Sequence, residues 1–222
     1  MNEDALLVRT DRGLWAVADG MGGHDAGDVA SSKVTESLLD LPDAGELDEL
    51  VESAVEALQR VNQELIDLAG PGGDERRSIG STVVGLAIAD GQFRCFWAGD
   101  SRAYRLRDRN IVQLTRDHSL VQDLVDMGML QADEAVDHPN SNIITRAVGV
   151  NKELRIETIG GDVKPGDIFL LATDGLTRMV GDEELAQELS SNSPAAAAEK
   201  LINLVLTRGA PDNVSIIITR KI

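Results

Sequence analysis

The segment Val17-Ala18-Asp19-Gly20-Met21-Gly22-Gly23-His24 constrains the fold of this chain more than any other. The apolar run Trp15 to Ala18 predicts a buried strand, and the apolar spacing from Ala26 to Asp40 predicts a helix. Between them, a carboxylate and three glycines leave the backbone open to a small charged partner, because glycine has no Cβ. This layout is typical of a binding site, but a tight turn with Asp19 capping the helix explains the segment alone equally well.

Two common functions of a glycine-rich turn are excluded by the spacing. A dinucleotide-binding turn needs a third glycine at position 25, where this chain has Asp25, and the Gly-Lys-Ser/Thr sequence of a phosphate-binding loop is absent. An acidic turn would also repel a phosphate unless a cation lay between them. The turn therefore favours a metal site as a hypothesis.

Further carboxylates lie where apolar strands meet turns, and a predicted hairpin with its turn at 11–13 brings Glu3 and Asp4 beside Asp19. Like charges 4 Å apart repel by about 4 kcal/mol at an effective dielectric constant near 20, so a cation would stabilise such a group. Carboxylates and backbone carbonyls, with few histidines, select Mg²⁺ or Mn²⁺ over Zn²⁺. Two ions about 3.5–4 Å apart would hold a water and direct it at phosphorus. The candidates at strand ends are Glu3, Asp4, Asp19, Asp100, Asp174 and Asp212.

The order of the predicted elements favours an α+β fold in which helices cover both faces of packed antiparallel sheets. Strands are expected at 5–8, 14–18, 80–88, 93–98, 103–107, 111–114, 154–159, 168–173 and 214–219, and helices at 26–40, 47–68, 120–127 and in two segments after 181. We expect the strands between 80 and 114, with a hairpin at Asp90-Gly91, to form one antiparallel meander, and residues 131–142 to be irregular. No repeat or linker divides the chain, so residues 1–222 are predicted to form a single domain.

The chain carries 38 acidic and 21 basic residues, a net charge of −17, which argues against nucleic acid and anionic membranes as partners. No apolar run approaches the ~18 residues of a membrane span, and no signal-peptide pattern is visible. The single cysteine, Cys95, cannot form an internal disulfide and favours a cytoplasmic protein. A cysteine-based phosphatase needs arginine at position 101, which is Ser101, and the Gly-x-Ser-x-Gly sequence of a serine hydrolase is absent. Cys95, Ser81 and Ser101 are therefore predicted to be structural.

Seven short motifs, in this order along nearly the whole chain, resemble the bacterial metal-dependent serine/threonine protein phosphatases of the 2C type. They are Asn2-Glu3-Asp4, Asp19-Gly20-Met21-Gly22-Gly23, Gly80-Ser81-Thr82, Gly99-Asp100-Ser101-Arg102, Asp117-His118-Ser119, Thr173-Asp174-Gly175 and Asp212-Asn213. The resemblance implies a four-layer α-β-β-α sandwich with a small flap near 120–145, and hydrolysis of phosphoserine and phosphothreonine by a metal-bridging water. The glycine-rich segment 15–31 also resembles the branch that accompanies type VI secretion systems (T6SS), where the phosphatase opposes a threonine kinase.

The resemblance also implies a binuclear Mn²⁺ or Mg²⁺ centre and a role for each acidic residue in it. Asp19 would bridge the two ions, and the carbonyl of Gly20 would bind one of them. Asp174 and Asp212 would hold the first ion. The catalytic residues implied are Asp19 and Asp174, with His24 as a further candidate.

The remaining acids would serve the second ion and a third one. Glu3 would orient waters of the second ion, with Asp4 nearby. Asp100 would join Asp174 at a third, weaker site that is seen in bacterial relatives.

Two departures from the family pattern affect the predicted function. The family carries a strand and a phosphate-gripping arginine before Asn-Glu-Asp, whereas this chain starts at Met1-Asn2, so we expect a truncated start or another phosphate contact, and weaker substrate binding. Some relatives have a histidine, proposed as the general acid, where Met21 stands, and methionine cannot donate a proton. His24 is the alternative acid, although a lone histidine after a glycine turn is more often a capping or surface residue.

Two other functions stay open at this point. The missing arginine favours a catalytically weakened domain of the same fold that binds or regulates phosphoproteins, and a small-molecule phosphatase would share the metal chemistry. The expected partners are proteins phosphorylated on serine or threonine, together with a cognate kinase and its substrates. We expect a cytoplasmic monomer that neither binds nucleic acid nor inserts into membranes.

Overall fold

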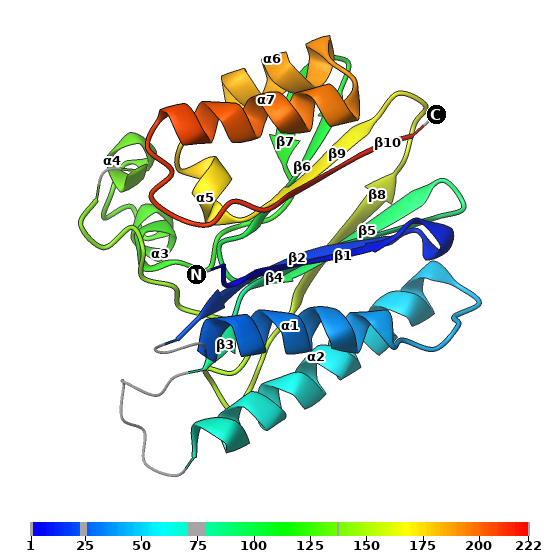
Figure 1. Ribbon diagram of the computed structural model, residues 1–222, viewed down its shortest axis with the longest axis vertical. Helices are drawn as coiled ribbons and strands as arrows, with labels where there is room; N and C mark the ends of the chain where they lie inside the picture. The colour runs from blue at the N-terminus through cyan, green and yellow to red at the C-terminus, as the bar shows by residue number, and fades with distance from the viewer. Residues whose placement is uncertain (1, 23–25, 71–78, 137, 222) are drawn as a thin grey trace.

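Two antiparallel sheets packed face to face form the centre of the fold (Figure 1). A computed structural model of the chain describes residues 2–22, 26–70, 79–136 and 138–221. The first sheet contains β1 (Asp4–Arg9), β2 (Leu14–Met21), β3 (Gly80–Ser81), β4 (Val83–Ala89), β5 (Gln92–Ala98) and β8 (Glu157–Asp162), in the order β1-β2-β4-β5-β8 with β3 paired to β2. The second contains β6 (Arg102–Arg107), β7 (Asn110–Gln113), β9 (Ile168–Ala172) and β10 (Ile216–Arg220), in the order β10-β9-β6-β7.

Helices cover the outer faces of both sheets (Figure 1). Helices α1 (Ala26–Leu39) and α2 (Leu47–Ala69) lie on the first sheet, and α6 (Asp182–Ser191) and α7 (Pro194–Thr207) lie on the second. The α+β class and the four-layer α-β-β-α arrangement are therefore confirmed. None of the helices in the described ranges combines the length and the apolar character that a membrane span requires.

Strand β2 shows how the sequence forms the middle layers. Leu14 and Ala16 face the helices α1 and α2, whereas Trp15 and Val17 face the second sheet. Because both faces are covered, every residue from 14 to 18 is buried, and the strand is a continuous apolar run rather than an alternating one. Each fully buried leucine or valine contributes about 1.5–3 kcal/mol to stability.

Two tight turns hold the ladders of the first sheet in register. Strands β1 and β2 form the predicted hairpin, through the short 3₁₀ turn η1 (Thr10–Arg12), and Asp4 lies directly opposite Asp19. The predicted hairpin at Asp90-Gly91 joins β4 to β5, and both residues have positive φ, 49° and 73°, as a type I′ turn requires.

The predicted meander between residues 80 and 114 is wrong, because the chain changes sheets at residues 99–101. Strand β5 pairs with β4 and β8, whereas β6 pairs with β7 and β9 of the other sheet. Gly99 permits the crossing, since it has φ +117° and a Cβ there would lie 2.6 Å from the Cβ of Thr82. The crossing places Asp100 between the two sheets at one end of the sandwich.

Several other elements differ from the prediction. Residues 131–142 contain a short helix, α4 (Ala132–Val136), and the strand expected at 154–159 is β8, which begins at Glu157. The strand expected at 168–173 ends at Ala172, and Asp174 begins another short helix, α5 (Asp174–Thr177). The last strand begins at Ile216 rather than at Val214. The glycine-rich loop predicted around residues 70–75 lies mostly outside the described residues.

The predicted flap is a segment between β7 and β8 that contains α3 (Leu120–Asp126) and α4. Ser119 caps α3 as its sequence predicts, because its side chain accepts a hydrogen bond from the Gln122 amide at 3.3 Å. Figure 1 shows α3 and α4 beside the end of the sandwich where α5 and the N-terminus lie. The flap is therefore next to the acidic strand ends.

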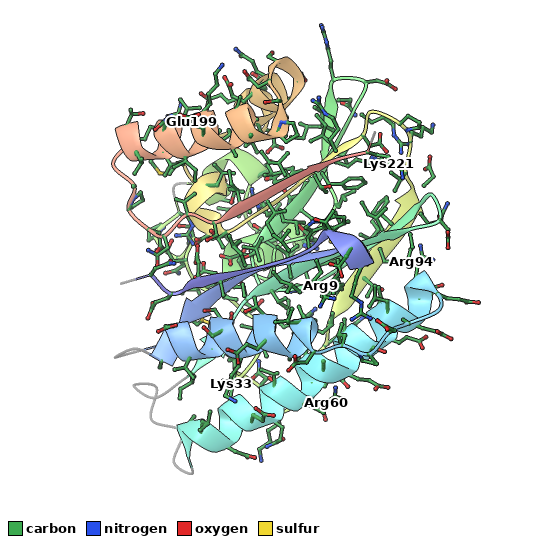
Figure 2. The ribbon with its side chains drawn as sticks, turned by 45° about the vertical axis from the view of Figure 1, so that its right-hand side comes forward. Arg9, Lys33, Arg60, Arg94, Glu199 and Lys221 are labelled. Carbon is green, nitrogen blue, oxygen red and sulfur yellow. The ribbon has the colours of Figure 1, made fainter. Side chains whose placement is uncertain are left out.

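Basic residues on the first sheet and its helices form ion pairs with helical acids, as two residues labelled in Figure 2 show. Lys33 of α1 lies 2.9 Å from Glu64 of α2, and Arg94 of β5 lies 2.8 Å from Asp48 of α2. Exposed pairs of this kind contribute at most about 1 kcal/mol each. They join surface elements and have no contact with the acidic strand ends.

Candidate metal centre

Five of the predicted acidic residues gather at one end of the sandwich. Asp4 and Asp19 are cross-strand neighbours, and Asp174 follows β9, whose neighbour β10 is preceded by Asp212. Asp100 lies at the sheet crossing. The charges of the other four all raise the pKa of Asp19, which shows that this carboxylate is within electrostatic range of each of them.

Glu3 and Gly20 lie at the same end but face α1. The Gly20 amide donates to the Glu3 carbonyl at 3.0 Å, and a Cβ on Gly20 would lie 2.0 Å from the carbonyl oxygen of Gly27. Only glycine therefore fits where β2 passes the first turn of α1. The Glu3 carboxylate lies against this same turn, since a Cβ on Gly27 would be 2.8 Å from its Oε1.

Burial and mutual repulsion make the carboxylates of this cluster hard to ionise. Burial, followed by the charges of Asp174 and Asp4, raises the pKa of Asp19 to about 9. Burial and the charge of Asp174 raise the pKa of Asp100 to about 7, and burial also raises the pKa values of Asp4 and Asp174. A divalent cation among them would reverse these shifts, because it stabilises the ionised form of each carboxylate.

Three of these carboxylates each carry a buried oxygen that has no hydrogen-bond partner. The atoms are Oδ1 of Asp4, Oδ1 of Asp100 and Oδ1 of Asp174. A buried acceptor without a partner costs about 1–3 kcal/mol, so such atoms are rare unless something else binds them. Oxygen atoms with free lone pairs are the ligands that Mg²⁺ and Mn²⁺ prefer, and the residues therefore fit an ion of this class.

Neighbouring polar residues fix the orientation of the acids. The hydroxyl of Thr173 donates to Asp4 Oδ2 at 3.1 Å and accepts from the Ser215 amide at 3.0 Å. The side chain of Asn213 accepts from the Glu3 amide at 2.8 Å. Thr173 and Asn213 have no role predicted from the sequence, although each is adjacent to a predicted ligand within one of the seven motifs.

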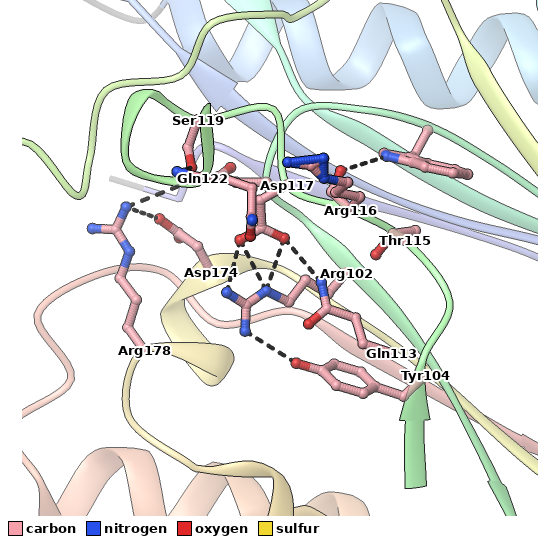
Figure 3. Close-up of polar contacts among 12 residues, drawn as sticks. Arg102, Tyr104, Gln113, Thr115, Arg116, Asp117, Ser119, Gln122, Asp174 and Arg178 are labelled. Carbon is pink, nitrogen blue, oxygen red and sulfur yellow. Dashed lines mark hydrogen bonds and ion pairs between the residues drawn. The ribbon is translucent and has the colours of Figure 1, made fainter. Parts of the chain in front are cut away.

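The predicted ligands do not converge on a single point in the part of the chain that the structure describes. Among the residues that the structure describes, no three Asp, Glu, His or Cys side chains already have the arrangement that would hold an ion. Arg178 lies between two of the acids, with its Nη2 2.8 Å from Asp174 Oδ2 and 3.7 Å from Asp100 Oδ2 (Figure 3). An ion shared by Asp100 and Asp174 would therefore lie next to Arg178. Arg178 was not predicted from the sequence as a site residue, although its spacing of four from Asp174 matches a helical ion pair.

A cavity of about 290 Å³ opens beside the carboxylates, between the flap and the second sheet. Helices α3, α4 and α5 line it, together with Asp100 and Asp174. Arg102 also borders it and holds Asp117 through contacts of 2.7 to 3.0 Å, while its other nitrogen donates to Tyr104 (Figure 3). The cavity can receive a polar side chain next to the acids. The ion pair between Arg102 and Asp117 stabilises its wall.

His118, from the Asp117-His118-Ser119 motif, connects the sheet crossing to the base of the flap. Its ring stacks on Trp97 with centroids 6.1 Å apart, and its Nδ1 accepts from the Gly99 amide at 3.1 Å. Its Nε2 lies 2.9 Å from Arg146 and 3.3 Å from Glu157. Burial, then the charge of Arg146, lowers the pKa of His118, so this histidine has a structural role.

His24, the candidate general acid, lies outside the described residues. Cys95 is fully buried in the first sheet and burial raises the pKa of its thiol, in agreement with the structural role predicted for it.

Comparisons with known proteins agree with this fold. A family model described as Protein phosphatase 2C matches residues 1–207. The serine/threonine protein phosphatase PstP of Mycobacterium tuberculosis is 35% identical over 220 residues, which are 98% of this chain and 41% of that protein. This chain therefore spans less than half the length of PstP.

Two solved structures are similar to the whole chain. PppA, described as a key regulatory component of T6SS in Pseudomonas aeruginosa, superposes with a TM-score of 0.91 at 43% identity, over 100% of this chain and 92% of that one. The catalytic domain of the serine/threonine protein phosphatase PstP, solved in complex with two manganese ions, superposes with a TM-score of 0.85 at 33% identity, over 98% of this chain and 90% of that one.

Proposed function

This chain belongs to the protein phosphatase 2C family, and from that membership we propose that it removes phosphate from phosphoserine and phosphothreonine in proteins, using divalent metal ions. The observation that carries the proposal is the cluster of buried carboxylate oxygens without partners on Asp4, Asp100 and Asp174, beside Asp19. Such a cluster is unfavourable unless cations bind it. The manganese-bound PstP domain supports Mn²⁺ as the ion, and Mg²⁺ is the alternative of the same chemistry.

We assign the ligands of the first ion as the resemblance implies. Asp19 would serve both ions, the carbonyl of Gly20 would be a further ligand, and Asp174 and Asp212 would complete the first site. When bound, such ions lower the pKa of a water between them and neutralise charge on the phosphoryl oxygens. The protons that the raised pKa values keep on Asp19 must leave before an ion can bind.

Glu3 orients the waters of the second ion in this proposal, and Asp4 supports it. The hydrogen bond from Thr173 to Asp4, and the one from the Glu3 amide to Asn213, favour these roles because they hold both acids in place. Asp100 and Asp174 provide the third, weaker site. We keep His24 as the residue that donates a proton to the leaving oxygen.

The substrate class and partners are part of the same proposal. The phosphorylated side chain would enter the cavity between the flap and the carboxylates, which Arg102 and Arg178 border. The likeness to PppA favours a protein of a T6SS pathway as the substrate and a serine/threonine kinase as the opposing enzyme. We further propose that residues 1–222 form one catalytic domain that acts as a monomer in the cytoplasm.

The test is phosphate release from a small aryl phosphate and from phosphopeptides, with and without Mn²⁺. We expect activity that EDTA abolishes, that Mn²⁺ restores, and that Asp19→Ala removes. A chain that binds phosphopeptides but never hydrolyses them would instead be a phosphoprotein-binding domain. Preference for sugar phosphates over phosphothreonine peptides would make it a small-molecule phosphatase.

A further inference from the structure

Arg178 makes contacts on two sides of the carboxylate cluster. Its Nη2 lies 2.8 Å from Asp174 Oδ2 and 3.7 Å from Asp100 Oδ2 (Figure 3). Its Nη1 donates a hydrogen bond to Oδ1 of Asn142, in the flap. About one third of the side chain is exposed, so the guanidinium has room to leave the carboxylates.

Arg178 is the basic residue that contacts Asp100 and Asp174 at this edge of the site. Of the residues that the structure describes, no other Lys, Arg or His lies within 4.0 Å of Asp100 or Asp174. Its charge lowers the pKa values of both acids, yet burial and the neighbouring carboxylates still raise them overall. The cluster therefore keeps an excess of negative charge that one guanidinium does not neutralise.

The guanidinium and a divalent ion cannot occupy the space between these carboxylates together. The oxygens that Arg178 contacts belong to the two acids that carry partnerless Oδ1 atoms, so an ion that uses them would lie next to the guanidinium. Two cations at that separation repel strongly in a partly buried site. An ion must therefore displace Arg178, and the displaced side chain loses its place beside Asn142 as well.

We propose that Arg178 is a positioning residue that competes with a divalent ion for Asp100 and Asp174 and thereby links occupancy of this site to the flap. With the guanidinium in place, Asn142 and the flap are held towards α5. With an ion in place, the flap loses this contact and the cavity can open to a phosphorylated chain. The inference rests on the proposed metal centre, and it adds a residue that regulates the centre.

Calorimetric titration of the purified chain with MnCl₂ tests the competition. Arg178→Ala and Arg178→Gln should each strengthen the weakest Mn²⁺-binding step by about tenfold or more, because both remove the competing charge. The matched control is Arg208→Ala, since Arg208 pairs with the exposed Glu184 on α6 and lies outside the cluster. Arg208→Ala should leave every binding step unchanged.

Hydrogen exchange of the flap tests the link. The amides of Ser141 and Ile143 are hydrogen-bonded within the flap at 2.9 and 3.1 Å and report on its order. In the native chain, Mn²⁺ should speed their exchange; in Arg178→Ala, exchange should be fast already and insensitive to Mn²⁺. Asn142→Ala should remove the response of the flap and strengthen Mn²⁺ binding modestly, because ion binding then no longer breaks the Arg178–Asn142 hydrogen bond.

The outcomes separate this inference from the proposed function. Identical Mn²⁺ isotherms for the native chain and both Arg178 variants, while Asp19→Ala abolishes binding, would overturn the role of Arg178 and leave the metal centre intact. Unchanged Mn²⁺ binding in Asp19→Ala would overturn both. Changed isotherms with no change in flap exchange would overturn the link between ion and flap.

Discussion

Two buried aspartates at opposite ends of the second sheet, Asp167 and Asp100, have opposite electrostatic environments. Asp167 is 1% exposed and accepts hydrogen bonds from Arg107 at 2.8 and 2.7 Å and from the Lys164 amide at 2.8 Å. Burial alone would raise the pKa of Asp167, but these bonds lower it. Asp100 is 5% exposed and has an oxygen without a partner, and its pKa is raised to about 7.

This difference distinguishes a carboxylate with a structural role, Asp167, from one with a functional role, Asp100. Both ends of the sheet bury a carboxylate, so burial does not identify a site. At the Asp167 end both carboxylate oxygens of Asp167 have donors within the chain. At the Asp100 end the chain leaves acceptors and negative charge uncompensated, which is the condition that a metal centre requires.

The largest expected effect comes from Asp19→Asn. This variant should lower kcat/KM at least about a thousandfold, because several kcal/mol of charge stabilisation in the transition state depend on the ions that Asp19 bridges. In EDTA its melting temperature should equal or exceed that of the native chain, because asparagine is neutral at this buried position without taking up a proton. Phosphate release and calorimetry measure the two effects. A marked loss of stability in EDTA would mean that Asp19, like Asp167, has a structural role.

Asp167→Asn should have the opposite effect. It should lower the free energy of unfolding by about 2–3 kcal/mol, since Arg107 loses its charged partner, and leave Mn²⁺ affinity unchanged. Urea denaturation and metal titration measure this. The control is Asp162→Asn, which removes the half-exposed second partner of Arg107 and should cost less than about 1 kcal/mol. Equal losses for both variants would contradict the comparison.

Without metal, the pH dependence of stability should be set by the carboxylates at the Asp100 end of the sheet. The raised pKa values of Asp19, about 9, and Asp100, about 7, mean that the folded chain keeps protons which the unfolded chain releases above about pH 4. Stability in EDTA should therefore fall as the pH rises from 5 to 8, by up to about 1.4 kcal/mol per pH unit for each proton that the folded chain retains. Denaturation at both pH values measures this. Saturating Mn²⁺ should abolish or reverse the trend, and a metal-free protein that becomes more stable over this range would contradict it.

Local patterns were sufficient to predict the acids at strand ends. Asp19 and Asp174 follow continuous apolar runs, and the turn at Gly13 fixes the hairpin that places Asp4 opposite Asp19. Each of these inferences needs only neighbouring residues. The α+β class also follows from the order of elements, because two helical pairs and several strands leave few ways to cover the sheets.

Contacts between distant segments were not predictable from the same patterns. One of the two partners of β6 is β9, more than 60 residues later in the chain, so the apolar pattern from 80 to 114 fitted a meander equally well. Strand β8 contains Gly160 and Gly161, which are typical of a turn, but Arg94 and Phe93 fill the space above them. Arg178 reaches Asp100 and the flap only in the folded chain.

The smallest effect should come from Thr173, the hydroxyl that orients a predicted ligand. Thr173→Val removes the 3.1 Å hydrogen bond to Asp4 and should weaken Mn²⁺ binding about tenfold, as loss of an outer partner of a metal ligand generally does. Thr115→Val is the matched control, since Thr115 is equally buried and accepts from the Ala103 amide at 3.1 Å away from the acids. Calorimetric titration with MnCl₂ compares them. If both variants bind Mn²⁺ like the native chain, the Thr173 hydroxyl has a structural role only. The metal site would then begin at Asp174 and would not include Thr173.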